Sequence, residues 1–306
     1  MLHQTNRRGF LVRSGLACAG LSGAAITGAW SGRTSAIEPI ARRGPAKFKF
    51  SLAAYSYRDL LNGDPPLLSL TDFVNDCAAL GLEGTELTSY YFPDPVTEDY
   101  LRQLKQQCFL LGLDVSGTAV GNDFGLPPGE ERRQQLEHVR RWIEHAEILG
   151  APVIRIFAGH AHHEDTAQAH RWMVEGIEEC CDYAGQHGVH LALENHGGPT
   201  ATADGMLAFV RDVRSPWFGI NLDTGNFHSE DIYGDLALLA PYTLNVQVKI
   251  RVSGPDGQQQ PSDLGRLAEI LRAALYRGYI VLEYEESGDP RTECRKHMDQ
   301  LRAAFG

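Results

Sequence analysis

Four polar side chains recur at the same position of four apolar segments in the second half of the chain. Each segment carries apolar residues at every second position, which is the period of a β-strand with one apolar face. The polar residue lies near the end of its segment, in the opposite phase. The four are Glu194 in VHLALEN, Asp223 in FGINLDT, Gln247 in LNVQVKI and Glu283 in YIVLEYE.

Three carboxylates that meet at the ends of neighbouring strands repel one another unless a cation or protons neutralise them. A hard divalent ion such as Mn²⁺ or Mg²⁺ accepts carboxylate and amide oxygens and keeps positions open for water. A lone acidic residue at a strand end is more often a helix cap or a solvated loop residue, whereas four polar residues in phase favour a common site. The sequence therefore predicts that Glu194, Asp223, Gln247 and Glu283 bind one divalent metal.

Such a site suits proton abstraction beside a carbonyl group. The metal would hold a hydroxyl and the adjacent carbonyl oxygen of a substrate and would stabilise the resulting enediolate. Glu194 and Glu283 would take and return the proton from opposite faces of the carbon. Lys249, in phase with Gln247, would stabilise the oxyanion or act as an acid, and an ion pair with one of the carboxylates is its alternative role.

Other polar residues stand on the strands or at their ends. His196 is expected in acid–base chemistry or in substrate binding, with an exposed loop histidine as the alternative. Substrate contacts are expected from Glu86, Arg155 and His160. Tyr55 fits the core as well as it fits the site.

The elements that would position these side chains alternate from Phe48 onward. Strands that alternate with helices pair in parallel through right-handed crossovers, and eight repeats predict a closed (β/α)₈ TIM barrel of one domain over residues 48–306. An open doubly wound sheet is the alternative, but no glycine-rich phosphate loop follows the first strand. The expected strands are 50–57, 83–88, 113–120, 152–159, 189–195, 218–224, 244–250 and 279–285, and the expected helices are 69–80, 97–111, 129–149, 164–187, 202–212, 230–239, 261–276 and 290–305.

The motifs LALEN, NLDTGN, VQVK and LEYE, in this order, resemble the xylose isomerase-like superfamily of sugar isomerase and epimerase barrels. In that family a Glu, an Asp, a His and a second Glu from strands five to eight bind one divalent metal. The resemblance carries this role over to Glu194, Asp223 and Glu283. The four candidate positions are 29, 24 and 36 residues apart, similar to the family's spacing.

Two positions depart from the family's pattern. Gln247 stands where the family usually has its His ligand, which shifts the preference from Zn²⁺ towards Mn²⁺ or Mg²⁺ and leaves a weak or absent metal as the alternative. Asn226 stands where the family often has a second His, and His228 follows two residues later. Both are expected to contact the substrate.

The N-terminus carries a targeting pattern. Paired arginines in TNRRGFLV precede a Gly- and Ala-rich apolar run at 16–30 and small residues at 34–36, which resembles a twin-arginine export signal. The run is too weak for a stable membrane anchor, which needs about 20 apolar residues. We expect a cleaved signal peptide at 1–36, a linker at 37–47 and periplasmic or other exported delivery by the twin-arginine machinery; an ordinary disordered N-terminus is the alternative.

Charge and cysteine content limit the classes of partner. Removing residues 1–36 takes away four arginines and no acidic residue, which lowers the formal charge from −11 to −15. Such a surface repels phosphate backbones, so nucleic acid is not an expected partner. The five remaining cysteines lack ligand spacing, and the adjacent Cys180 and Cys181 lie on one expected helix, which favours buried free thiols over disulfides.

The sequence therefore predicts a divalent-metal-dependent isomerase or epimerase that acts on an unphosphorylated sugar or sugar derivative through an enediolate. The resemblance also implies the first alternative, a lyase that enolises a 3-keto-glycoside and expels the aglycone by β-elimination. A second is a non-catalytic sugar-binding barrel, which a loss of the metal at Gln247 would favour. An endonuclease of the same superfamily fits least, because it needs more His ligands and a basic face. A homo-oligomer is left open.

Overall fold

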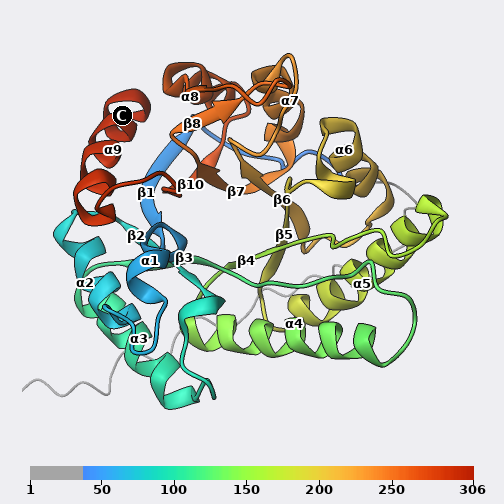
Figure 1. The fold of residues 1–306 in the computed structure, drawn as a ribbon, viewed down its shortest axis with the longest axis horizontal. Helices are drawn as coiled ribbons and strands as arrows, with labels where there is room; N and C mark the ends of the chain where they lie inside the picture. Colours follow the sequence, from blue (N-terminus) through green and yellow to red (C-terminus); the bar gives the residue numbers. More distant parts are fainter. Residues whose placement is uncertain (1–36) are drawn as a thin grey trace, which may run out of the picture. The chain divides into compact units, whose positions relative to one another are not determined.

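Eight parallel strands close into a barrel in the computed structural model, which describes residues 37–306 (Figure 1). Their order around the barrel is β1-β10-β7-β6-β5-β4-β3-β2, and the described residues form one compact unit. The predicted (β/α)₈ barrel is confirmed, and the open sheet is excluded. The strands are β1 Lys47–Ala53, β2 Gly84–Thr88, β3 Asp114–Ala119, β4 Val153–Ile156, β5 His190–Glu194, β6 Phe218–Asp223, β7 Thr243–Val248 and β10 Arg277–Leu282.

Helices follow the strands and form the outer ring of the barrel (Figure 1). Side-chain caps fix their starts: the carboxylates of Asp263 and Asp289 accept backbone N–H groups at the starts of α8 and α9. Gly150 ends α4 in the left-handed conformation, with φ of 79°. The helices are α1 Arg58–Leu61, α2 Leu70–Ala79, α3 Glu98–Leu110, α4 Glu130–Leu149, α5 Thr166–Gln186, α6 Ala203–Asp212, α7 Ile232–Leu239, α8 Leu264–Ala273 and α9 Pro290–Phe305.

The predicted element boundaries are close to the observed ones, with two corrections. The first strand ends at Ala53, and the predicted remainder is a 3-10 helix, Ala54–Tyr57, which turns the chain over the barrel mouth. A short antiparallel hairpin of β8, Arg251–Ser253, and β9, Gln259–Pro261, interrupts the path from β7 to α8. This hairpin was not predicted, because its second strand, QQP, is exposed and has no alternation of apolar and polar residues.

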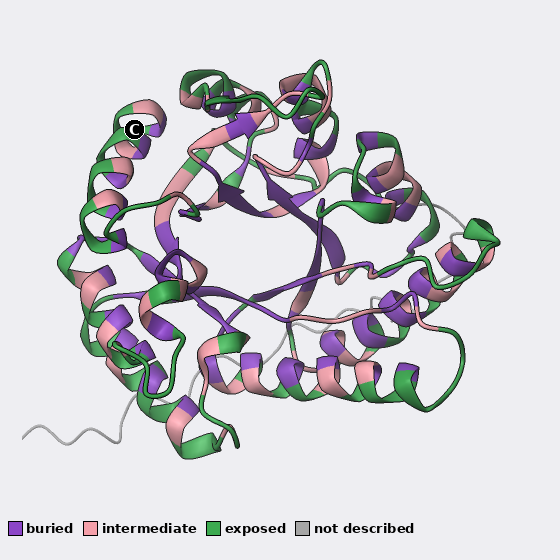
Figure 2. Cartoon of the chain, viewed as in Figure 1, coloured by how far each residue is buried: buried purple, intermediate pink, exposed green. Residues whose placement is uncertain are grey.

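The barrel wall has an apolar outside and a polar inside. Ile220 and Val246 are fully buried towards the helices, and most of the barrel's strand residues appear purple in Figure 2. Asn221 and Asn245 alternate with them and are also buried, and their side chains hydrogen-bond to each other inside the barrel. The alternation predicted from the sequence therefore separates a hydrophobic layer from an interior of hydrogen-bonded amides.

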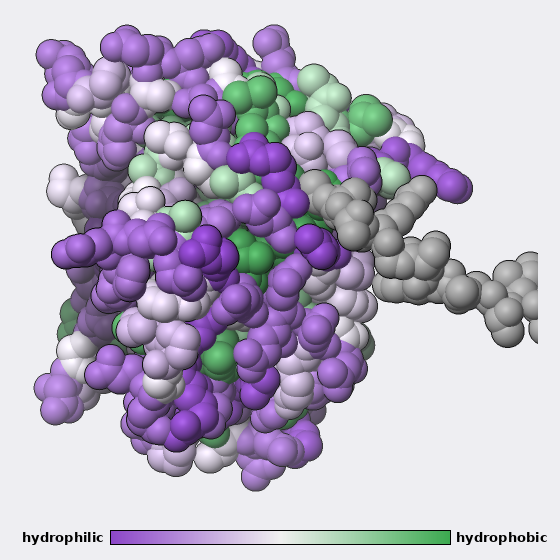
Figure 3. Space-filling model, turned by 90° about the vertical axis from the view of Figure 1, so that its right-hand side faces the viewer, coloured by the Kyte–Doolittle hydropathy of each residue, from purple (hydrophilic) through white to green (hydrophobic). Residues whose placement is uncertain are grey.

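Hydrophilic residues dominate the face shown in Figure 3, where apolar side chains form small, separated groups. No helix within residues 37–306 is long and apolar enough to cross a membrane. The five cysteines of this part of the chain are buried and free, as predicted. The predicted signal peptide at 1–36 lies outside the described residues.

Candidate functional site

A cavity of about 420 Å³ opens at the carboxyl ends of the barrel strands. Glu194 is the last residue of β5, while Lys249 and Glu283 each follow the last residue of a strand, β7 and β10 respectively. This end of a TIM barrel is where strand termini and loops form the site. The lining residues are Tyr55, Tyr90, Arg155, Phe157, Glu194, His196, Asn226, Lys249, Glu283 and Glu285.

Glu194 is held on two sides within the cavity. Its Oε2 lies 2.8 Å from Arg155 Nε, and its Oε1 accepts a hydrogen bond of 3.0 Å from Asn226 Nδ2. The side chain is nearly fully buried. Burial raises the pKa of Glu194 well above its ordinary value, although Arg155 acts in the opposite direction. Glu194 therefore holds a proton more readily than an exposed carboxyl does.

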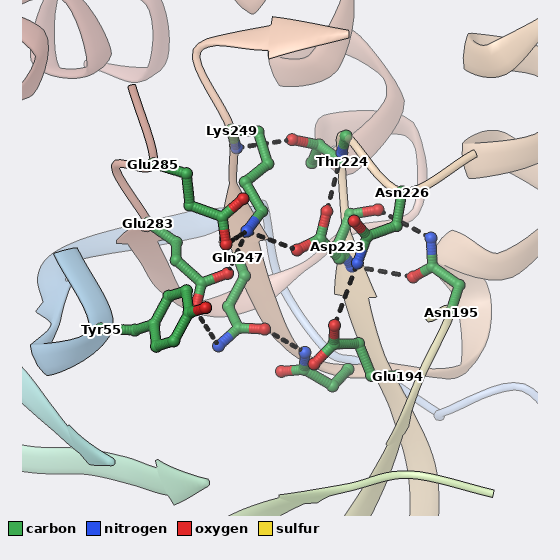
Figure 4. A network of polar contacts seen from close by, with 12 residues as sticks. Tyr55, Glu194, Asn195, Asp223, Thr224, Asn226, Gln247, Lys249, Glu283 and Glu285 are labelled. Atoms are coloured by element: carbon green, nitrogen blue, oxygen red, sulfur yellow. Dashed lines mark hydrogen bonds and ion pairs between the residues drawn. The ribbon is translucent and has the colours of Figure 1, made fainter. Parts of the chain in front are cut away.

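Lys249 points into a group of three carboxylates (Figure 4). Its Nζ lies 2.5 Å from Glu283 Oε2, 2.6 Å from Glu285 Oε1 and 3.5 Å from Asp223 Oδ2. Burial alone would lower the pKa of Lys249, but the three carboxylates raise it well above its ordinary value. Lys249 is therefore an ammonium ion at the centre of the site.

Asp223 is sealed beneath this ammonium, with no solvent-exposed surface. Its Oδ1 accepts the Gly225 N–H at 2.8 Å, whereas its Oδ2 has no hydrogen-bond partner among residues 37–306. Asn195 fixes the backbone of Asp223 through hydrogen bonds to both its N–H and its carbonyl, each 2.9 Å long. Burial raises the pKa of Asp223 to about 7, against the effect of Lys249.

A ring of four side chains closes the floor of the site. Asn245 Nδ2 donates to Glu86 Oε2 (2.8 Å) and to Asn221 Oδ1 (2.9 Å). Asn221 Nδ2 donates to Gln247 Oε1 (2.5 Å), and Gln247 Nε2 donates to Glu86 Oε1 (2.7 Å). Burial, and next the charge of Glu283, raise the pKa of Glu86 to about 7. The side-chain amides of Asn221, Asn245 and Gln247 therefore all form hydrogen bonds within the ring.

The family described as xylose isomerase-like TIM barrel matches residues 74–304. The chain belongs to this family. None of the curated proteins matches the chain by sequence. Solved structures provide the remaining comparison.

Solved structures share the fold at low sequence identity. A D-psicose 3-epimerase from Clostridium cellulolyticum H10 has a TM-score of 0.69 and 16% identity, covering 84% of this chain and 99% of its own. A 3-keto-D-glucoside 4-epimerase from E. coli has a TM-score of 0.61 and 17% identity, covering 84% and 99%. A probable 3-DHS dehydratase from Bacillus anthracis has a TM-score of 0.65 and 19% identity, covering 83% and 98%. At these identities the similarity shows the fold alone.

The four ligands predicted for this xylose isomerase-like barrel converge, but their donor atoms do not fit a divalent metal. Gln247 Oε1 accepts from Asn221, and its Nε2 faces Glu86 and, at 3.4 Å, Glu283 Oε1. Reversing this amide would set its oxygen against two carboxyl groups. The ammonium of Lys249 stands between Asp223 and Glu283, and no group of three or more His, Cys, Asp or Glu within residues 37–306 is placed to hold a metal ion.

The structure places the other predicted residues in three groups. Glu194, Glu283, His196, Lys249, Arg155 and Asn226 line the cavity. Glu86, Asp223 and Gln247 are buried below it: Glu86 lies in the middle of β2, Gln247 precedes the last residue of β7, and Asp223 ends β6 beneath Lys249. His160 and His228 are exposed and do not line the cavity, so their expected substrate contact stays a prediction. Phe227, which precedes His228, packs into the core.

Four lining residues had no predicted role in the site. The Phe157 ring lies 4.4 Å from that of His196 and stacks under the Arg155 guanidinium at 4.0 Å, both measured to ring centroids. Tyr90 sits in a 3-10 turn after β2, where no strand period applies, and faces Tyr55. Phe157 and Glu285 are in phase with Arg155 and Glu283, and that continuation beyond the strand end was the signal that could have found them.

Proposed function

We propose that the chain is a sugar isomerase or epimerase-type enzyme that abstracts a proton beside a carbonyl group. The main support for this proposal is that two carboxyl groups, those of Glu194 and Glu283, line one cavity. β5 and β10 are separated by β6 and β7 on one side of the barrel and by the other four strands on the opposite side, so the two carboxyls reach the cavity from different directions. Two bases on different sides of one carbon are what epimerisation requires.

In the proposed reaction one carboxylate breaks the C–H bond beside the carbonyl and takes its proton. The electron pair moves onto the carbonyl oxygen, and the second carboxyl returns a proton to the opposite face. Negative charge then develops near Arg155 and Lys249, the two cations that line the cavity. Divalent-metal dependence, which the sequence pattern predicted, is not part of this proposal because the donor atoms do not fit a metal.

The walls of the cavity support a carbohydrate as the substrate. Tyr55, Tyr90 and Phe157 offer apolar ring faces, while Asn226 and Glu285 add polar groups suited to hydroxyls. Such a mixture matches a molecule with C–H faces and hydroxyl edges. The similar folds of a D-psicose 3-epimerase and a 3-keto-D-glucoside 4-epimerase support the same class.

An unphosphorylated substrate is favoured by the charges at the cavity. Arg155 is paired with Glu194, and Lys249 is paired with Glu283 and Glu285. A phosphate group would have to compete with these carboxylates for its partners. The predicted export signal, if it directs the chain out of the cytoplasm, also removes the enzyme from phosphorylated metabolites.

A 3-keto-glycoside lyase is the second candidate, because the first half-reaction is the same and a dehydratase shares the fold. The purified protein would be incubated with a panel of ketoses and 3-keto-glycosides. Formation of an epimer or a ketose–aldose isomer supports the first function, and release of an aglycone supports the second. Turnover of neither class, with the folded protein at high concentration, would leave the non-catalytic sugar-binding barrel.

A further inference from the structure

The main chain of Lys249 is held at both of its polar groups. Its N–H donates to Thr224 Oγ1 at 2.9 Å, and its carbonyl accepts from Ser262 Oγ at 2.7 Å. Ser262 is itself fixed, because its N–H donates to the Ile250 carbonyl at 3.0 Å directly after the β8–β9 hairpin. The hairpin therefore anchors the residue that carries the ammonium.

The carbon stem of Lys249 occupies space that Gly225 leaves free. A Cβ atom at Gly225 would lie 2.6 Å from Lys249 Cγ and 2.7 Å from its Cβ, closer than atoms can pack. The backbone of Gly225 is not in the left-handed region, so its conformation does not require glycine. The absence of a side chain at Gly225 serves the placement of Lys249.

The ammonium reaches the same carboxylates that the sequence pattern assigns to a metal. Lys249 Nζ contacts Glu283 and stands 3.5 Å from Asp223, and Arg155 holds Glu194. The remaining predicted ligand, Gln247, has its oxygen engaged by Asn221. Each candidate ligand is therefore already paired within the protein, either with a cationic side chain or, for the Gln247 oxygen, with a hydrogen-bond donor.

We infer that Lys249 is the built-in cation of this site and takes the place of a divalent metal. Its ammonium donates a hydrogen bond to the substrate's carbonyl oxygen as that oxygen gains the electron pair of the broken C–H bond. The proton passes to Glu194 or Glu283, and no co-reactant is needed. This role in turnover rests on the proposed function, whereas the exclusion of a metal from the site can be tested without any substrate.

The first test is Mn²⁺ binding by the unmodified protein, followed by electron paramagnetic resonance of the free ion. We expect below about 0.1 equivalent bound, and turnover that changes less than about two-fold after chelation. Stoichiometric Mn²⁺ binding that Glu194→Gln abolishes would overturn the inference. It would leave the proposed function standing, because a metal-bound site can perform the same chemistry.

The second test removes the ammonium. Lys249→Met should lower turnover about 10²- to 10³-fold, the scale of losing an oxyanion partner. The double variant Gln247→His with Lys249→Met should gain Mn²⁺ binding and a metal-dependent rise in melting temperature, because it supplies an imidazole and removes the competing charge. Lys249→Met activity equal to the unmodified protein would contradict the role of Lys249.

Two further variants keep the tests interpretable. Gly225→Ala retains every charge but displaces the Lys249 stem, so it should lower turnover by at least about ten-fold even if Lys249→Met fails to fold. Lys49→Met makes the same chemical change at an exposed ion pair at the other end of the barrel and should alter neither turnover nor Mn²⁺ binding. Normal turnover in Gly225→Ala would count against the placement argued for Lys249.

Discussion

The two ends of the barrel each contain a lysine paired with carboxylates, yet only one end has the features of a reactive site. At the amino ends of the strands, Lys49 Nζ lies 2.6 Å from Asp114 Oδ2, with side-chain exposures of 38% and 61%. At the carboxyl ends, Lys249 Nζ lies 2.5 Å from Glu283 Oε2, with exposures of 10% and 8%. The two lysine–carboxylate distances are alike, so the two ion pairs differ mainly in how deeply they are buried.

The protonation of the two ends follows from this burial. Hydrogen bonds from Lys49 and Tyr279 lower the pKa of Asp114, which stays ionised. Burial raises the pKa of Asp223 to about 7 even though Lys249 is near. A cavity alone does not distinguish the ends either, since one of about 350 Å³ lies beside Lys49. The carboxyl end is set apart by carboxyls that exchange protons near neutral pH.

The largest expected contrast is in catalysis. Glu283→Gln should lower turnover about 10²- to 10⁴-fold, because it removes a proton-transfer group. Asp114→Asn at the opposite end should leave turnover within about two-fold. Steady-state rates of both variants on the same sugar provide the measurement. Equal losses in the two variants would show that the effect of Glu283→Gln is structural.

The second contrast is in stability. Arg155→Met leaves Glu194 buried without its cation and should lower the free energy of unfolding by about 3–5 kcal/mol. Lys49→Met breaks an exposed pair and should cost about 0–1 kcal/mol. Urea unfolding at pH 8 compares the two, and a loss below 1 kcal/mol for Arg155→Met would contradict the buried pair.

The third contrast is in the response to pH. Glu86 has a pKa of about 7 in the folded protein and an ordinary value of 4.5, so its contribution to stability is present below pH 4.5 and is lost as pH rises through 7. The difference corresponds to about 3 kcal/mol. Glu86→Gln should remove this fall in the free energy of unfolding between pH 4.5 and 7. An unchanged pH profile in Glu86→Gln would contradict the raised pKa.

The smallest effect should have the opposite sign. The pKa of Asp114 is lowered in the folded protein, so its contribution is present above the ordinary value of 3.8 and is lost as pH falls through the folded value. Asp114→Asn should therefore cost a few tenths of a kcal/mol at neutral pH and nothing in acid. Thermal unfolding at pH 3 and pH 7 provides the measurement. A larger loss in acid than at neutral pH would contradict this assignment.

The fold was predictable because its signals are local. The two-residue period of the strands, the glycine after α4 and the aspartates before α8 and α9 depend on neighbouring residues alone. The β8–β9 hairpin carried no such period. The inward phase of Glu194, Asp223, Gln247 and Glu283 was predictable for the same reason.

The partners of these side chains were not predictable. Whether Lys249 pairs with Glu283 or leaves room for a metal depends on the Gly225 backbone and the Ser262 anchor, which are set by the three-dimensional path of the chain. The direction of the Gln247 amide depends on Asn221 and Glu86, from two other strands. Strand phase identifies which residues face inward, but it does not identify the charge that each one meets.

The most direct test of the central claim is proton exchange in D₂O by chelator-treated protein with candidate ketoses and 3-keto-glycosides. We predict that deuterium enters the substrate at the carbon beside the carbonyl, that mass spectrometry detects it in recovered substrate and product, and that Glu194→Gln combined with Glu283→Gln abolishes it. Absence of exchange with every candidate, or exchange that appears only when a divalent metal is restored, would contradict a metal-free proton-transfer site at the mouth of this barrel.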